Sequence, residues 1–198
     1  MSTSRKQLED WIKTIEIPSG VKVIDVGGAQ KPIKGRTKSW GEAVKYYIAD
    51  LPNPHQLDGE TNKEFYINAD LNKPMDVKWP EEDNKPADIV FCLEVSEYLY
   101  DPLTAFKNLA KMLKQDGFLY MSFHFLYPVH EPYHEDYLRY TFHGVLKYLE
   151  LAGLELADYR MKNAENYMPS ELFAAEGMKM AKEINHDATG WLIKARKI

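Results

Sequence analysis

The chain has 198 residues, of which 44% are hydrophobic and 28% charged, and its formal net charge is −5. This length suits one α/β domain with a sizeable core and is short for two. Acidic and basic residues are interspersed, and a net negative chain argues against a nucleic-acid groove, which needs a basic stripe. A small basic group is more simply interpreted as a solvated loop: Lys31, Lys34, Arg36 and Lys38.

The N-terminus, MSTSRKQLEDWIK, has no apolar signal core, and no segment approaches the ~18 uninterrupted apolar residues of a membrane span. The single cysteine, Cys92, lies in the apolar run DIVFCL. A lone cysteine excludes an intramolecular disulfide and a thiolate zinc cluster. We therefore expect a cytoplasmic protein in which Cys92 is a small core residue.

Helical spacing first appears at residues 4–16, where Leu8, Trp11, Ile12 and Ile15 form one apolar stripe within an N-terminal unit of residues 1–20. Apolar, β-branched runs then predict five strands. These strands cover residues 21–26, 45–49, 64–68, 87–93 and 117–124.

Between the last two of these strands, DPLTAFKNLAKMLKQDG predicts a helix with Asp101 as N-cap, Pro102 at the first position and Gly117 just past its end. A second helix, about 141–152, ends at Gly153, and the chain returns as the strand candidate LELADYRM. A third helix, SELFAAEGMKMAKEI, leads into a final strand, TGWLIKARKI.

Strands separated by helices or long crossovers predict an α/β fold, doubly wound, with helices on both faces of a mainly parallel, seven-stranded sheet. We expect one domain over residues 1–198, with 87–93 as a central strand and the closing strand as an antiparallel edge. In such sheets, ligands bind at the carboxyl ends of the strands. The loops that follow those ends are therefore the candidate site.

The first strand runs into Asp25-Val26-Gly27-Gly28-Ala29, and Asp50 at the end of the second lies 22 positions beyond Gly28. Dinucleotide-binding folds place an acid about 20 residues on, where it accepts from ribose hydroxyls. However, Pro32 disfavours a helical conformation for Lys31, so no helix N-terminus directly follows the glycines to hold a phosphate. The pattern indicates a nucleoside ligand without a phosphate.

The third strand ends in Asn68-Ala69-Asp70-Leu71, an acid and an apolar side chain that suit the amino group and ring of adenine. The fourth runs into the polar loop Glu94-Val95-Ser96-Glu97-Tyr98. Each feature is weak alone, but their order favours one ligand. S-adenosylmethionine combines adenine, ribose, a sulfonium and an amino-acid tail, with no phosphate.

Six segments in family order carry a resemblance: VIDVGGAQKP, YYIADL, INADLNKP, ADIVFCLEVSEYLYDP, LAKMLKQDGFLYMSF and LYPVHEPYHEDYLRYTFHGVLKYLELAGL. With them the chain resembles the class I, Rossmann-like, S-adenosylmethionine-dependent methyltransferases, in particular a type 11-like group whose glycine motif runs into Lys/Arg-Pro. The resemblance departs at G-G-A-Q in the glycine motif, at KQDG where the family has KPGG, and at the insert NKPMDVKWPEEDNKP.

The resemblance implies S-adenosyl-L-methionine as cofactor and assigns its contacts residue by residue. The methionine tail and sulfonium would be surrounded by Asp25, Gly27, Gly28 and Ala29. The ribose would be held by Asp50 with Leu51 beside it, and the adenine by Asp70 and Leu71. The wall nearest the methyl group would be formed by Leu93 and Glu94.

Residues 130–134, His-Glu-Pro-Tyr-His, formally match the HExxH motif of zinc proteases. That chemistry needs both histidines on one face of a regular helix, and Pro128 and Pro132 oppose a helix here. We therefore expect no metal site. The preferred interpretation is a loop and helix over residues 125–150 that carry the acceptor site.

In that loop His130 is the first candidate for general base and His134 the second, while Arg139 and Tyr140 are candidates for orienting the acceptor. An equally simple reading is that Asp136 and Arg139 pair and hold the loop. His124, inside the preceding strand, is read as an ordinary packed histidine.

The sequence therefore predicts an S-adenosylmethionine-dependent methyltransferase that acts on a small-molecule or saccharide-like acceptor by in-line displacement, with neither nucleic acid nor membrane as partner. A catalytically inactive nucleoside-binding or scaffold module is the alternative, because the glycine motif is degraded. A nicotinamide-dependent oxidoreductase is weaker, because the phosphate-binding helix is missing. The acceptor and the oligomeric state stay open.

Overall fold

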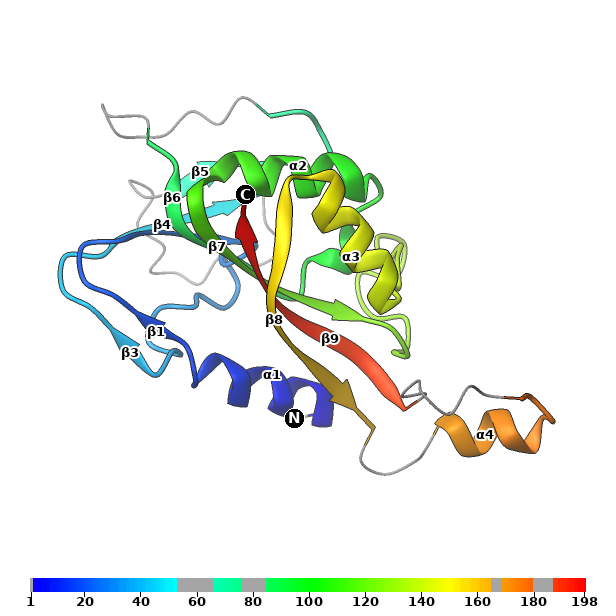
Figure 1. Cartoon of the computed structure of the whole chain (residues 1–198). Coiled ribbons are helices and arrows are strands. Elements are labelled where there is room, and N and C mark those ends of the chain that lie inside the picture. Colours follow the sequence, from blue (N-terminus) through cyan, green and yellow to red (C-terminus); the bar gives the residue numbers. More distant parts are fainter. Residues whose placement is uncertain (1, 53–65, 76–84, 165–168, 180–186) are drawn as a thin grey trace.

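The computed structural model describes residues 2–52, 66–75, 85–164, 169–179 and 187–198. Its main feature is a seven-stranded sheet in the order β5-β4-β2-β6-β7-β9-β8 (Figure 1). These strands are β2 (Lys22–Val26), β4 (Lys45–Asp50), β5 (Tyr66–Asn68), β6 (Ala87–Cys92), β7 (Leu113–His124), β8 (Leu154–Asn163) and β9 (Ala188–Lys197). A second, two-stranded sheet pairs β1 (Glu16–Ile17) with β3 (Ser39–Trp40).

The helices are α1 (Thr3–Ile12), α2 (Pro102–Met112), α3 (Phe142–Leu151) and α4 (Pro169–Ala175), with a short 3-10 helix, η2 (Ser96–Tyr98), after β6. In Figure 1, α2 and α3 lie on one side of the sheet and α1 on the other. The α/β class and the two helical faces expected from the sequence are confirmed. Across the described ranges, no helix has the length and apolar character needed to cross a membrane.

The strands β5, β4, β2, β6 and β7 are parallel to one another, whereas β9 is antiparallel to both β7 and β8. The closing strand is therefore antiparallel, as predicted, but its expected place at the edge was wrong. It lies between β7 and β8, and β8 forms the edge. The burial explains this order: β9 is buried along most of its length, while most of β8 is exposed or half-buried.

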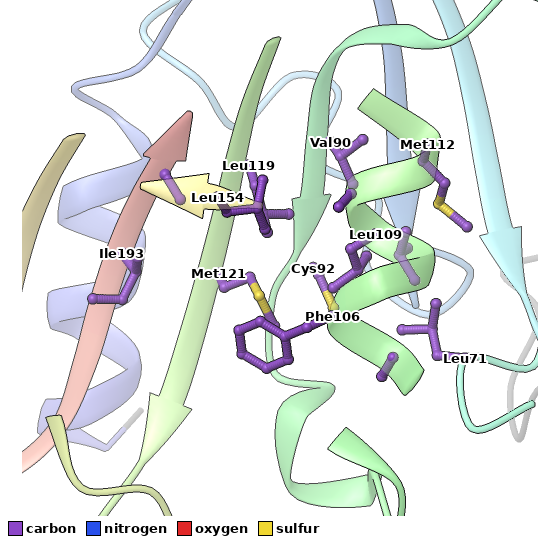
Figure 2. Packing of buried hydrophobic residues seen from close by; sticks show 14 of the residues in the cluster. Leu71, Val90, Cys92, Phe106, Leu109, Met112, Leu119, Met121, Leu154 and Ile193 are labelled. Carbon is purple, nitrogen blue, oxygen red and sulfur yellow. The ribbon is translucent and has the colours of Figure 1, made fainter. Parts of the chain in front are cut away.

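Side chains of the central strand β6 alternate between two apolar clusters. Val90 and Cys92 pack with Phe106, Leu109 and Met112 on the side of α2 (Figure 2). The intervening residues pack on the opposite side with the apolar face of α1, which is formed by Leu8, Trp11 and Ile12. Because each fully buried apolar side chain of this size contributes roughly 1.5–3 kcal/mol, the two clusters hold helices on both faces of the sheet.

Capping residues set the helix starts as the sequence predicts. The Asp101 carboxylate accepts from the Thr104 backbone N–H at 3.1 Å, and Pro102 opens α2. At the other end, α2 stops at Met112 rather than near Gly117, because buried Leu113 already pairs with Ala87 as the start of β7.

Two further segments differ from the sequence prediction. The third helix, expected over SELFAAEGMKMAKEI, ends at Ala175, two residues before Gly177, whose φ of +74° is not helical; residues 180–186 lie outside the described part of the chain. Residues 27–44, which connect β2 to β4, are all described and contain no α-helix. The prediction that no helix N-terminus directly follows the glycines is therefore confirmed.

Candidate active site

A pocket of about 380 Å³ lies at the carboxyl ends of the parallel strands. This volume falls within the range of small-molecule sites. Its walls come from the loops after β2, β4, β5, β6 and β7, so five segments far apart in the sequence meet there. The lining residues are Val26, Gly27, Gln30, Ala49, Asp50, Leu51, Ala69, Asp70, Leu71, Asn72, Glu94, Val95, Tyr98, Leu99, Glu131, Pro132 and Glu135.

The turn after β2 is built around two glycines that a larger residue could not replace. Gly27 has a φ of +73°, and a Cβ added there would lie 2.3 Å from Val95 Cγ2. A Cβ on Gly28 would lie 2.4 Å from the Asp25 carboxylate. Gly27 lines the pocket, whereas Gly28 and the buried Ala29 are not among its lining residues.

Asp25 holds this turn from inside the protein. Its Oδ2 accepts from the Ile33 backbone N–H and from the Tyr46 hydroxyl, both at 2.7 Å. Burial raises the pKa of this carboxyl to about 6, although the two hydrogen bonds oppose that shift. Asp25 does not line the pocket, so its contacts support the loop between residues 27 and 36.

Three of the four basic residues of this loop form ion pairs. Glu9 on α1 accepts from Lys31 Nζ at 2.6 Å and from Arg36 Nη2 at 2.9 Å. Burial would raise the pKa of Glu9, but the bonds from these two cations lower it to about 2. Lys38 pairs with Glu16. These ion pairs fasten the glycine loop to α1 and β1, and they do not form a basic groove.

Asp50 ends β4 and faces the pocket. Its Oδ2 accepts from the Ala29 N–H at 3.2 Å and its Oδ1 from the Leu51 N–H at 2.8 Å. Since a carboxylate offers about four acceptor positions, these bonds fix its orientation and are compatible with accepting from a vicinal diol. Leu51, which is exposed, also lines the pocket.

Asp70 and Leu71 form the wall contributed by the loop after β5. Asp70 Oδ1 accepts from the Asn72 N–H at 3.1 Å, and its other oxygen pairs with Lys73 at 2.9 Å. The buried amide of Asn108, on α2, donates to the carbonyls of Leu71 and Lys73 at 3.0 and 2.8 Å. Asn108 therefore holds the loop that presents Asp70 and Leu71.

Glu94 follows β6 with a φ of +56°, a conformation that is uncommon for a residue other than glycine. Its backbone N–H donates to Ser122 Oγ at 2.7 Å, and Ser122 Oγ donates to Glu94 Oε1 at 2.9 Å. These bonds hold the Glu94 side chain in the pocket wall, while Leu93 is not among the lining residues.

Two of the four residues proposed for acceptor chemistry, Arg139 and Tyr140, bond to groups within the protein. Arg139 donates to the Asp136 carboxylate, at 2.7 Å through Nη2, and to the carbonyls of Tyr127 and Pro128. The Tyr140 hydroxyl is buried and donates to the Ser96 carbonyl at 3.0 Å. Arg139 and Tyr140 are thus turned to the protein, and the reading in which Asp136 and Arg139 hold the loop fits this geometry.

His134, the second candidate for general base, is 82% exposed at its side chain and contacts Glu135. His134 does not line the pocket. The structure has no helix between residues 125 and 141, so the HExxH letters do not place their two histidines on one helical face. The zinc-protease reading of this motif therefore does not apply.

His130 lies between η2 and the loop after β7. Its Nδ1 is 3.1 Å from the Tyr98 hydroxyl and 3.2 Å from the Glu131 carbonyl, and its Nε2 is 3.4 Å from Glu97 Oε1. The contact with Glu97 raises the pKa of His130 to about 8, although partial burial opposes this shift. Tyr98 and Glu131 line the pocket, whereas His130 lies behind them.

Glu97 and His124, each 1% exposed at the side chain, extend this group into the interior. His124 Nε2 lies 3.4 Å from Glu97 Oε1 and 3.5 Å from Glu94 Oε2. Burial lowers the pKa of His124, but the two glutamates raise it to a greater extent. His124 is packed in the interior, as the sequence predicted, and its ring lies beside two glutamates.

Several lining residues were missed by the sequence reasoning because they contribute shape or lie in loops without a motif. Val95 fills the space beside Gly27, and Tyr98 reaches the acceptor loop. Proximity to a strand end was the only signal available for most of them. The missed side chains with polar or aromatic groups are Gln30, Asn72, Tyr98, Glu131 and Glu135.

The donor set of the pocket fits S-adenosylmethionine. Carboxylates at Asp50, Asp70 and Glu94 suit ribose hydroxyls, an amino group and a positive sulfonium, respectively. Apolar contacts from Val26 and Leu71 suit the adenine ring. A Cβ on Gly27 would collide with the Val95 side chain, so glycine allows the turn after β2 to pack closely against the loop after β6.

Comparison with known proteins gives a partial family match. The family model of the methyltransferase domain matches residues 53–121, about a third of the chain. No curated protein matches the sequence.

Solved structures share the fold at low sequence identity. A candidate methyltransferase from Bacillus halodurans C-125 is 14% identical with a TM-score of 0.62, and the match covers 99% of each chain. A SAM-dependent methyltransferase from Aquifex aeolicus is 17% identical with a TM-score of 0.59, covering 98% of this chain and 89% of that one. Magnesium protoporphyrin IX methyltransferase from Synechocystis PCC 6803, solved with bound SAM, is 14% identical with a TM-score of 0.53, covering 98% and 76%.

The family match, the strand order and the strand-end pocket agree. They are consistent with the class I, Rossmann-like, S-adenosylmethionine-dependent methyltransferase superfamily, which the family model supports over residues 53–121. Its cofactor is S-adenosylmethionine, as the family match indicates.

Proposed function

We propose that this protein, acting as one domain over residues 1–198, transfers the methyl group of S-adenosylmethionine to a small-molecule or saccharide-like acceptor. One observation carries the proposal. The pocket brings Gly27, Asp50, Asp70 and Glu94 together from four separate strand ends, in the order in which the cofactor needs them. The family match adds independent support.

In this proposal each side of the pocket has one task. Asp50 accepts from the ribose hydroxyls, and Asp70 with Leu71 recognises adenine. Gly27 gives the methionine tail room, and Glu94 lies beside the sulfonium. When bound, the cofactor supplies a methyl group that the positive sulfur already activates for displacement.

The acceptor would enter past the loop after β7, whose Glu131, Pro132 and Glu135 complete the lining. This loop is held by the Asp136–Arg139 ion pair and by two backbone N–H groups, those of Tyr137 and Leu138, that donate to the Glu97 carbonyl. A fixed wall matters because holding acceptor and methyl in line contributes up to roughly 7–11 kcal/mol to the rate. Arg139 is therefore a positioning residue in this proposal.

Proton removal from a hydroxyl acceptor would add about 10²–10⁴-fold. The sequence pointed to His130 as the first candidate for general base, and its contact with Glu97 raises its pKa to about 8, so His130 stays that candidate in this proposal.

The first test is calorimetry with S-adenosylmethionine and its demethylated product. Asp50→Asn should weaken binding about 10–100-fold, because it removes charge-assisted hydrogen bonds worth roughly 1.5–3 kcal/mol. Asp10→Asn, an exposed acid on α1, is the matched control and should bind as the wild type does. Equal affinity of the two variants would remove Asp50 from the cofactor site.

The same measurement separates the competing functions. A wild-type protein that binds neither compound would favour the inactive nucleoside-binding or scaffold module, which the G-G-A-Q motif and the absence of Gly28 and Ala29 from the lining keep open. Binding of NADH instead would favour an oxidoreductase. If S-adenosylmethionine binds, labelled methyl transfer to sugar, amine, phenol and carboxylate acceptors identifies the substrate class.

A further inference from the structure

Three side chains from three different segments converge behind the pocket. Glu97 belongs to η2, His124 ends β7, and His130 lies in the following loop. The Nε2 atoms of both histidines lie 3.4 Å from the same atom, Glu97 Oε1. One donor atom from each side chain lies within 4.8 Å of the others.

The buried atoms of this group lack hydrogen bonds of ordinary geometry. Glu97 Oε1 and both ring nitrogens of His124 have no hydrogen-bond partner in the part of the chain that the structure describes. A buried polar atom without a partner costs about 1–3 kcal/mol, and more if it is charged. Two of these atoms, Glu97 Oε1 and His124 Nε2, lie 3.4 Å apart, which indicates that a further group belongs between them and His130.

The surroundings of His130 fix which of its nitrogens faces that point. Its Nδ1 contacts the Glu131 carbonyl and the Tyr98 hydroxyl, and the Tyr98 hydroxyl itself donates to the Glu131 carbonyl at 3.0 Å. Nδ1 therefore carries a proton, and Nε2 points to Glu97. A carbonyl that orients a histidine through its other ring nitrogen is the usual outer contact of a metal-binding histidine.

The distances favour a metal ion over shared protons. A charge-assisted N–H···O bond measures about 2.7–2.9 Å, well below the 3.4 Å found twice here. Two ligands in a tetrahedron with bonds of about 2.0–2.1 Å lie about 3.3–3.4 Å apart. The spacing of both histidines from Glu97 matches that value.

We propose that Glu97, His124 and His130 form a binding site for one divalent transition-metal ion, with Zn²⁺ as the best match. Two imidazoles and one carboxylate are a typical three-residue zinc set, which leaves a position for water or an oxygen of the acceptor. Mg²⁺ and Ca²⁺ prefer oxygen ligands alone. The proposal revises the expectation from the sequence that the chain holds no metal.

The charge next to the site is arranged to permit a cation. The buried Lys162 ammonium, whose charge also acts on His124, lies 3.5 Å from Glu94 Oε1, and Arg5 lies 3.7 Å from Glu94 Oε2. Both positive groups thus lie against Glu94, which leaves Glu97 as the anionic ligand. Because Glu94 also lines the pocket, the proposed metal would lie next to the acceptor end of the active site.

The test measures Zn²⁺ binding itself, so it does not depend on methyl transfer. Protein treated with a chelator is titrated with Zn²⁺ by calorimetry, and Co²⁺ is then added to report the ligand geometry by its visible spectrum. We expect one ion per chain and a tetrahedral Co²⁺ spectrum. His130→Ala should weaken Zn²⁺ binding at least about 100-fold, more than the 10–100-fold typical of outer contacts.

His134→Ala is the matched control, since it removes the exposed second histidine of the HExxH letters, and it should leave Zn²⁺ affinity unchanged. If His130→Ala fails to fold, imidazole NMR of the wild type replaces it, and Zn²⁺ should shift the rings of His124 and His130 but not those of His134 and His143. A wild type that binds no Zn²⁺, or that loses binding with His134 rather than His130, would overturn the proposal. Zn²⁺ binding without S-adenosylmethionine binding would uphold it and reject the proposed function.

Discussion

Substituting Gly27 by alanine tests whether the turn after β2 is shaped by a steric limit. Two costs act at this position. A φ of +73° is a left-handed conformation that costs an L-residue about 1–2 kcal/mol. The added Cβ would also lie 2.3 Å from Val95 Cγ2, and overpacking of this kind costs about 1–3 kcal/mol.

Gly20 offers a control that separates the two costs. It has the same φ of +73°, but no atom lies within 4 Å of a Cβ added there. Gly20→Ala should therefore lower the free energy of unfolding by about 1–2 kcal/mol, and Gly27→Ala by about 2–5 kcal/mol. For a chain of this size, each kcal/mol lost from the free energy of unfolding lowers the melting temperature by roughly 2–4 °C.

Urea denaturation of both variants measures these free energies of unfolding. Val95→Ala, alone and combined with Gly27→Ala, completes a double-mutant cycle. In the double variant, Val95→Ala should recover most of the steric cost of Gly27→Ala but none of the cost of its φ. Because Gly27 and Val95 both line the pocket, Gly27→Ala should also weaken S-adenosylmethionine binding. Equal destabilisation by the two glycine substitutions, or no recovery in the double variant, would refute the steric argument.

Two further predictions concern buried polar groups. Burial raises the pKa of Asp25 from 3.8 to about 6, so the contribution of this carboxyl to stability, about 3 kcal/mol, is complete below pH ~3.8 and is lost as the pH rises through 6. Asp25→Asn should remove this part of the pH dependence of stability, measured by urea denaturation at pH 4 to 7. A variant whose stability falls with pH as steeply as that of the wild type would contradict the prediction. Asn108→Ala should lower the free energy of unfolding by about 2–4 kcal/mol and weaken cofactor binding, because it removes the donors that bond to the Leu71 and Lys73 carbonyls. Lys107 is exposed one residue earlier on α2, and Lys107→Ala should change the free energy of unfolding by no more than about 0.5 kcal/mol.

The strands and caps were predictable because their causes are local. The apolar run at 87–93 became the buried central strand β6, and Asp101 with Pro102 starts α2 where the cap pattern placed it. The end of α2 was not predictable in the same way. Residues 113–116 have acceptable helix propensity, and only the pairing of Leu113 with Ala87 draws them into β7.

The cofactor side of the site followed from the sequence better than the acceptor side did. Gly27, Asp50, Leu51, Asp70, Leu71 and Glu94 all line the pocket, because the carboxyl ends of parallel strands meet at one edge. The acceptor loop has no regular structure to relate residue spacing to direction. Arg139 and Tyr140 therefore bond to groups within the protein. The two histidines of the HExxH motif do not lie on one face of a helix.

By itself, the sequence determined the fold class, the run of strands and the absence of a helix behind the glycine turn, since periodicity, Pro32 and chain order act over short distances. The tertiary structure alone decided that the closing strand lies inside the sheet and that Asp25 supports its loop from within. It also brought Glu97, His124 and His130 to one point. Such a group depends on how a short helix, a strand end and a loop pack together, and no spacing along the chain encodes that.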